Sequence, residues 1–80
     1  MAVHEVSYDL RNPGRNYEAL YERLREYDHC HPLESVWLLD TSESAKTIRD
    51  YLMAVMDASD GILVTRMEGE WAPSASATRA

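Results

Sequence analysis

The sequence predicts an α+β fold in which a strand, a helix, an extended middle segment, a second helix and a last strand follow one another. Two observations lead to this prediction. Short runs rich in β-branched and aromatic residues stand near the start, in the middle and towards the end of the chain. Two stretches with apolar residues at helical spacing separate these runs. We therefore expect an antiparallel sheet with both helices on one face.

The first predicted strand covers residues 3–10, because valines and Tyr8 dominate it and the turn-forming pair Pro13-Gly14 closes it. Apolar side chains occur at both odd and even positions of this strand, so we place it in the centre of the sheet. Asp9 stands at the end of the strand. The ends of strands are where ligands and catalytic groups gather in open α/β sheets, which makes Asp9 the first candidate for a functional residue.

Two amphipathic helices are predicted over residues 16–28 and 43–57, since each stretch has one apolar stripe at helical spacing. Asn16 is the expected N-cap of the first helix, and Thr41 or Ser42 that of the second. The expected buried stripes are Tyr17, Leu20, Tyr21 and Leu24 in the first helix and Ala45, Ile48, Leu52, Val55 and Met56 in the second.

The middle segment, residues 29–40, is predicted to be extended because Pro32 disfavours a helix at the residue before it. It forms either one strand kinked near Glu34-Ser35 or two short strands. Counted as two strands, the complete order is the βαββαβ order of a ferredoxin-like sandwich. The last strand is expected over residues 62–68, followed by a short edge piece that ends at Trp71.

Composition limits the classes of function that this chain can have. Its 80 residues form one expected domain over residues 1–71 and a low-complexity tail, expected to be disordered, over 72–80. The net charge of −6 disfavours non-specific binding to nucleic acid, so such a partner requires a local basic patch. The single cysteine excludes an intrachain disulfide. With no apolar run of membrane-spanning length and no signal peptide in view, we expect a cytoplasmic protein without a membrane partner.

Several short motifs resemble, in order and spacing, the superfamily of CRISPR-associated protein two, and most closely its SinR-like relatives. The resemblance covers about residues 3–72, which is nearly the whole expected domain. The matching segments are Val6-Ser7-Tyr8-Asp9-Leu10, Leu33-Glu34-Ser35-Val36-Trp37-Leu38, Ala45 with Ile48-Arg49, Asp60-Gly61-Ile62-Leu63-Val64 and Gly69-Glu70-Trp71.

The resemblance implies a ferredoxin-like fold, a symmetric homodimer and a cellular setting in defence or toxin–antitoxin systems. In that superfamily the aspartate that ends the first strand lies near the dimer axis, and the pair is proposed to hold a divalent metal ion for phosphodiester cleavage. Asp9 matches this position, so the resemblance implies a catalytic residue and a ligand of Mg²⁺ or Mn²⁺ there. Ser35 matches a serine near the same axis. The extension that docks an integrase in that superfamily is not visible in this sequence, so we expect no integrase partner.

Asp9 has two interpretations when the residues are considered alone. As a metal ligand it would act with Asp9 of a second chain, and Arg11 and Arg15 in the adjoining loop would bind flanking phosphates of a nucleic acid. As a turn former, its carboxylate would accept N–H groups of the loop backbone. The second interpretation assigns Asp9 a purely structural role.

The open face of the predicted sheet favours a dimer, because a small domain gains stability by covering such a face. Tyr8, Ser35, Trp37 and Trp71 are the expected contacts, since aromatic residues are enriched in interfaces. His29-Cys30-His31 has no second ligand cluster in the sequence, so we do not expect a zinc site there.

Two hypotheses for function remain. The first is a non-catalytic homodimeric module that interacts with nucleic acid or protein. The alternative is a magnesium-dependent endonuclease that hydrolyses RNA or DNA with Asp9 from both subunits. The distance between the two Asp9 carboxylates in a dimer distinguishes them, because a shared cation requires that both lie within coordination distance.

Overall fold

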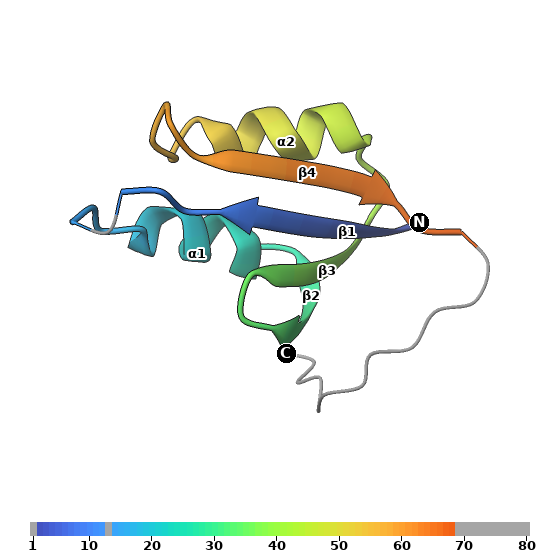
Figure 1. Cartoon of the computed structure of the whole chain (residues 1–80). Helices are drawn as coiled ribbons and strands as arrows, with labels where there is room; N and C mark the ends of the chain where they lie inside the picture. Colours follow the sequence, from blue (N-terminus) through green and yellow to red (C-terminus); the bar gives the residue numbers. More distant parts are fainter. Residues whose placement is uncertain (1, 13, 69–80) are drawn as a thin grey trace.

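The fold is seen in a computed structural model that describes residues 2–12 and 14–68 (Figure 1). The predicted ferredoxin-like βαββαβ order is confirmed. In chain order, the elements are β1 (Ala2–Asp9), α1 (Glu18–Arg25), β2 (Asp28–Leu33), β3 (Val36–Thr41), α2 (Ala45–Met53) and β4 (Gly61–Arg66).

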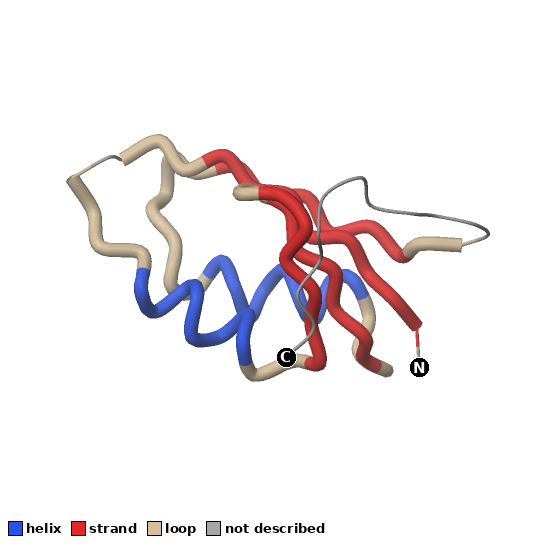
Figure 2. Tube along the Cα trace, turned by 90° about the horizontal axis from the view of Figure 1, so that it is seen from below, coloured by secondary structure: helices blue, strands red, loops and turns tan. Residues whose placement is uncertain are grey.

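The four strands form one antiparallel sheet in the order β2-β3-β1-β4. β1 lies inside the sheet between β3 and β4, as its apolar residues on both parities predicted. Both helices cover the same face of the sheet, which Figure 2 shows from below. No helix of the described residues covers the other face. None of the helices described has the length and apolar character that a membrane span requires.

The middle segment forms two strands rather than one kinked strand. β2 and β3 pair with each other and are separated only by Glu34-Ser35. The register between them shifts between Cys30 and Leu33. Pro32 lies within this stretch and has no N–H to donate to a neighbouring strand, which accounts for an irregularity at this point.

The hydrophobic core lies between the sheet and the two helices. The predicted stripes of both helices supply five of its eight buried residues, and the even-numbered positions of β1 with the odd-numbered positions of β3 supply the other three. Burying each of these larger side chains contributes about 1.5–3 kcal/mol. The buried cluster consists of Val6, Tyr17, Leu20, Leu24, Trp37, Leu39, Ile48 and Leu52.

Both helices are shorter than the sequence predicted, and their N-caps differ. The N-cap of α1 is Tyr17, one residue after the predicted Asn16, although the Asn16 side chain still accepts the Glu18 N–H at 2.9 Å. The N-cap of α2 is Ser44, whose hydroxyl accepts the Thr47 N–H at 3.2 Å. The predicted caps of α2 are wrong, because β3 extends to Thr41 and a turn separates it from the helix.

The helix-free face of the sheet, called the open face below, displays the odd-numbered side chains of β1. Ser7 of β1 lies in register with Val36 on β3 and with Leu63 on β4, so these three form a row across this face. Leu63 is 62% exposed, and Leu33 at the end of β2 is 53% exposed. The expected edge piece at 69–71 and the expected tail at 72–80 lie outside the residues that the structure describes.

Candidate functional site

Three of the predicted site residues meet at one end of the sheet. Tyr8, Asp9 and Ser35 line an open hollow of about 310 Å³, together with Glu34 and two apolar or aromatic neighbours. We call it the Asp9 hollow. The pairing of β1 with β3 explains this convergence, because Tyr8 donates its backbone N–H to the Ser35 carbonyl at 3.1 Å.

Asp9 is the last residue of β1, as predicted, and its carboxylate lies on the surface. Arg11 donates its Nε–H to Oδ2 of Asp9 at 2.9 Å, with the two side chains 59% and 68% exposed. An exposed pair of this kind contributes about 0–1 kcal/mol and exchanges partners readily. Among the described residues, no backbone N–H donates to Asp9; the turn that follows is closed by the Arg15 N–H on the Asn12 carbonyl at 2.9 Å.

Tyr8 and Trp37 are bound within the chain. The Trp37 Nε1–H donates to the Tyr8 hydroxyl at 3.0 Å, and that hydroxyl donates to the Glu34 carbonyl at 3.1 Å. Burial raises the pKa of the Tyr8 hydroxyl above its usual value. The His31 ring stacks on the Trp37 indole with a centroid distance of 3.9 Å.

The bonds of Tyr8 and Trp37 within the chain affect which of the expected residues can contact a second chain. Trp37 is only 3% exposed and belongs to the core, so it has almost no surface to offer a second chain. Trp37 lies in the core because it is on the helix-covered face of β3. The enrichment of aromatic residues in interfaces does not tell which face of a strand a residue occupies. Ser35 is exposed, Tyr8 is half-buried, and Trp71 lies outside the described residues.

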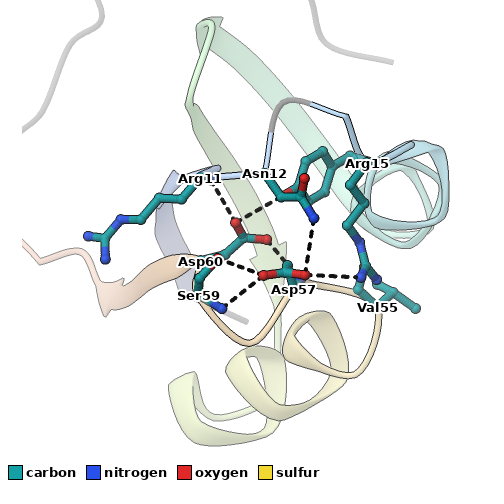
Figure 3. A network of polar contacts seen from close by, with 8 residues as sticks. Arg11, Asn12, Arg15, Val55, Asp57, Ser59 and Asp60 are labelled. Carbon is teal, nitrogen blue, oxygen red and sulfur yellow. Dashed lines mark hydrogen bonds and ion pairs between the residues drawn. The ribbon is translucent and has the colours of Figure 1, made fainter.

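The loop that follows β1 is tied to the α2–β4 loop by Asp60 (Figure 3). Oδ1 of Asp60 accepts the Arg11 backbone N–H at 2.7 Å and the Tyr17 hydroxyl at 2.8 Å, while Oδ2 accepts the Asp57 N–H at 2.8 Å. Burial opposes ionisation of Asp60, but these three donors outweigh it and lower the pKa of the carboxyl. We call these contacts the Asp60 clamp.

Asp57 adds a second set of contacts to the same pair of loops. Its Oδ2 accepts the Ser59 hydroxyl at 2.6 Å and the Ser59 N–H at 3.0 Å, and these bonds lower the pKa of Asp57. Arg15 lies 3.6 Å from Oδ1 of Asp57 and donates to the Val55 carbonyl at 3.2 Å. The guanidinium of Arg15, a predicted phosphate ligand, is therefore engaged in holding the loops together.

The roles of Asp57 and Asp60 were not predicted from the sequence: Asp57 is the last residue of the predicted helix over 43–57, and Asp60 occurs only in a segment that resembles the superfamily of CRISPR-associated protein two. The signal was present in the sequence. Asp57 and Ser59 stand two residues apart, which is the spacing at which an aspartate side chain accepts a backbone N–H in a turn.

The Asp9 hollow offers few side chains that could coordinate a metal ion. Within the part of the chain that the structure describes, no three His, Cys, Asp or Glu side chains are close enough to hold one. The two histidines of the His-Cys-His segment instead bond backbone carbonyls, His29 that of Tyr27 at 2.9 Å and His31 that of Glu34 at 3.0 Å.

No protein-family model matches this chain, and no solved structure matches it.

Proposed function

We propose that the protein is a homodimer that acts as a non-catalytic interaction module, and that its chains associate through the open face of the sheet. The observation that carries this proposal is the exposure of large apolar side chains on that face. Leu63 and Leu33 are 62% and 53% exposed, and Val36 lies between their strands. A symmetric homodimer is also what the resemblance to the superfamily of CRISPR-associated protein two implies.

Physical chemistry favours covering this face. Burying an exposed leucine contributes about 1.5–3 kcal/mol, and a second copy would cover the same residues twice. A chain of 80 residues buries a smaller fraction of its surface on folding than a larger protein does, so it gains proportionally more from association. The net charge of −6 on each chain opposes association, and added salt should therefore strengthen the dimer by screening this repulsion.

A non-catalytic role is supported by the surroundings of Asp9. Its carboxylate is paired with Arg11, and among the described residues that line the Asp9 hollow the only other carboxylate is that of Glu34. A single chain therefore offers a divalent cation few ligands in this hollow.

A protein partner fits the charges better than nucleic acid does. The two predicted phosphate ligands each face a carboxylate, Arg11 that of Asp9 and Arg15 that of Asp57. Binding a phosphate backbone would first have to break these ion pairs against a net negative charge.

Light scattering on the full chain tests the dimer, with two variants that make the same chemical change on opposite faces. Leu63→Lys places a charge on the open face and is expected to give monomers. Met53→Lys changes an equally large exposed side chain on α2 and is expected to leave the dimer intact. A wild-type monomer at micromolar concentration, or equal behaviour of both variants, would overturn the proposal. If the wild-type chain instead binds duplex or single-stranded nucleic acid strongly, the partner is nucleic acid rather than protein.

A magnesium-dependent endonuclease is the second candidate, and one observation favours it. Asp9 is 68% exposed and points to the same side of β1 as Ser7, so a dimer through the open face would bring two copies of Asp9 towards each other. Asp9→Ala is then expected to abolish magnesium-dependent cleavage of RNA or DNA and to leave the dimer intact. Asp50→Ala, an exposed carboxylate on α2, is the control. Cleavage that persists in the Asp9 variant would point to a contaminant and end this hypothesis.

A further inference from the structure

A second, larger hollow lies at the opposite end of the sheet from Asp9. It has a volume of about 530 Å³ and is formed where β1 begins, where β4 ends and where the chain enters α2. These three segments come together at one end of the molecule in Figure 1. We call it the α2 hollow. Ligand sites for small molecules commonly have volumes of about 300–1,000 Å³.

His4 lines the α2 hollow and has an unsatisfied polar atom. Its side chain is 3% exposed, and its Nδ1 is buried without a hydrogen-bond partner among the described residues. Buried side-chain nitrogens have a hydrogen-bond partner in the large majority of cases, so Nδ1 of His4 is an exception that remains available to a polar group entering the hollow.

Arg66 lies beside His4, because the two residues are register partners on β4 and β1. Arg66 is exposed and lines the α2 hollow. Within the described ranges it is also the only arginine or lysine for which no ion pair or hydrogen bond of the side chain is seen. The other cationic side chains each donate to a carboxylate or a carbonyl, namely Arg11, Arg15, Arg23, Arg25, Lys46 and Arg49.

The N-terminus of α2 adds backbone donors to the same hollow. Ser44 caps the helix and satisfies the Thr47 N–H, but the N–H groups of the helix start at Ala45 have no carbonyl one turn earlier. This end of a helix carries a partial positive charge and favours anions. Ser44, Ala45 and the hydroxyl-bearing Ser42 all line the α2 hollow.

One carboxylate, that of Glu43, also lines the α2 hollow and would repel an anion. Its Oε1 is held by the Tyr27 hydroxyl, which donates to it at 2.8 Å. Tyr27 lies in a neighbouring hollow that Glu43 also borders, so the carboxylate is drawn to that side.

We propose that the α2 hollow binds a phosphate group, either on a small phosphomonoester such as a mononucleotide or as free phosphate. The guanidinium of Arg66 comes from β4, and the hydroxyl of Ser42 and the backbone N–H groups at the start of α2 come from the segment that leads into the helix. Donors from these two sides suit the several oxygens of a tetrahedral anion. His4 forms the buried wall behind them. The site is separate from the Asp9 hollow and does not depend on the proposed dimer.

Titration calorimetry of the full chain with adenosine 5′-monophosphate, adenosine and inorganic phosphate distinguishes the sources. We expect the monophosphate to bind and adenosine not to bind. Equal affinity for inorganic phosphate would identify free phosphate as the ligand. In NMR spectra recorded during titration with the same compounds, the backbone amide resonances of Ala45 and Arg66 should shift. Absence of binding by both phosphate compounds at millimolar concentration would overturn the proposal.

Two charge-matched variants locate the site. Arg66→Gln is expected to weaken phosphate binding by about tenfold or more, since a charge-assisted hydrogen bond is lost. Arg49→Gln removes the same charge from the exposed side of α2, where Arg49 pairs with Asp50, and should leave the affinity unchanged. Equal losses in the two variants would show a general charge effect and refute a site at Arg66. Circular dichroism confirms that both variants are folded.

Discussion

The two ends of the sheet use polar side chains in opposite ways. At the end where β1 finishes, the charged groups of the loops are bonded to one another, Arg11 to Asp9, Arg15 to Asp57, and Asp60 to three donors. At the other end, His4 has an orphan nitrogen and Arg66 has no acceptor in the part of the chain that is described.

Charged residues near the end of a strand therefore do not by themselves indicate a binding site. At the Asp60 clamp, partners within the chain have already satisfied the polar groups, so their first role is to hold two loops together. At the α2 hollow, the donors remain available to a ligand. Variants of Asp60, His4 and the two loop arginines test whether the two ends differ in this way.

Asp60→Asn should have the largest effect, because it affects every bond of the Asp60 clamp. The amide nitrogen would face either the Asp57 N–H or the two donors on Oδ1, and donors do not bond donors. We expect the melting temperature to fall by about 10 °C in thermal unfolding followed by circular dichroism. Asp50→Asn, on the exposed side of α2, is the matched control and should change it by about 2 °C or less. Equal melting of the two variants would show that the clamp does not hold the loops.

Stability should fall in acid, and the clamp should account for part of this loss. The pKa values of Asp57 and Asp60 are lowered in the folded chain, whereas an unfolded aspartate has a pKa of about 3.9. Their contribution is therefore fully present above about pH 4 and is lost as the pH falls through the lower folded values.

Urea unfolding between pH 7 and pH 3 measures this dependence. The acid loss should be smaller in Asp60→Asn, since that variant has one titrating carboxyl fewer. An identical pH dependence in the variant and the wild type would contradict the lowered pKa of Asp60.

His4→Leu should act in the opposite direction at the other end. Leucine has a similar volume and removes the orphan nitrogen, so the free energy of unfolding should rise by about 1 kcal/mol in urea. A loss of about 2 kcal/mol or more would mean that the imidazole makes a stabilising bond, and the contrast between the two ends would then fail.

The smallest changes in the free energy of unfolding are expected at the two arginines of the loop that follows β1, and they should differ from each other. Arg15→Gln is expected to cost about 1 kcal/mol, because Arg15 bonds the Val55 carbonyl and pairs with Asp57. Arg11→Gln should cost about 0.5 kcal/mol or less, because the ion pair that the Arg11 side chain makes within the described residues is with the exposed Asp9. Equal costs in urea unfolding would place both arginines in the same structural role.

The fold could be predicted because its signals are local. The apolar spacing of Leu20 and Leu24 in α1 and of Ile48 and Leu52 in α2 is visible within a few residues, and all four side chains are buried. Helix ends were less predictable. Ser44 rather than Ser42 caps α2, since the length of β3 decides where the turn begins.

The sites were harder to predict because they depend on contacts between distant segments. Tyr8 and Asp9 are neighbours in the chain, and only Ser35 had to be brought to them. The pairing of His4 with Arg66 depends on the register between β1 and β4, which periodicity does not determine. Trp37 shows the same limit, since a core and an interface attract the same residue type.

The connection of β1 to β4 has a consequence for how fast the protein folds. Pairing Asp9 with Gly61 closes most of the chain into one loop, and such closure is slow compared with forming the hairpin of β2 and β3. The loops joined by Asp60 flank this pairing, so we expect their contacts to form after the transition state. Stopped-flow measurements on Asp60→Asn should then show faster unfolding at a nearly unchanged refolding rate. The clamp would thus set the lifetime of the native state rather than the time needed to reach it.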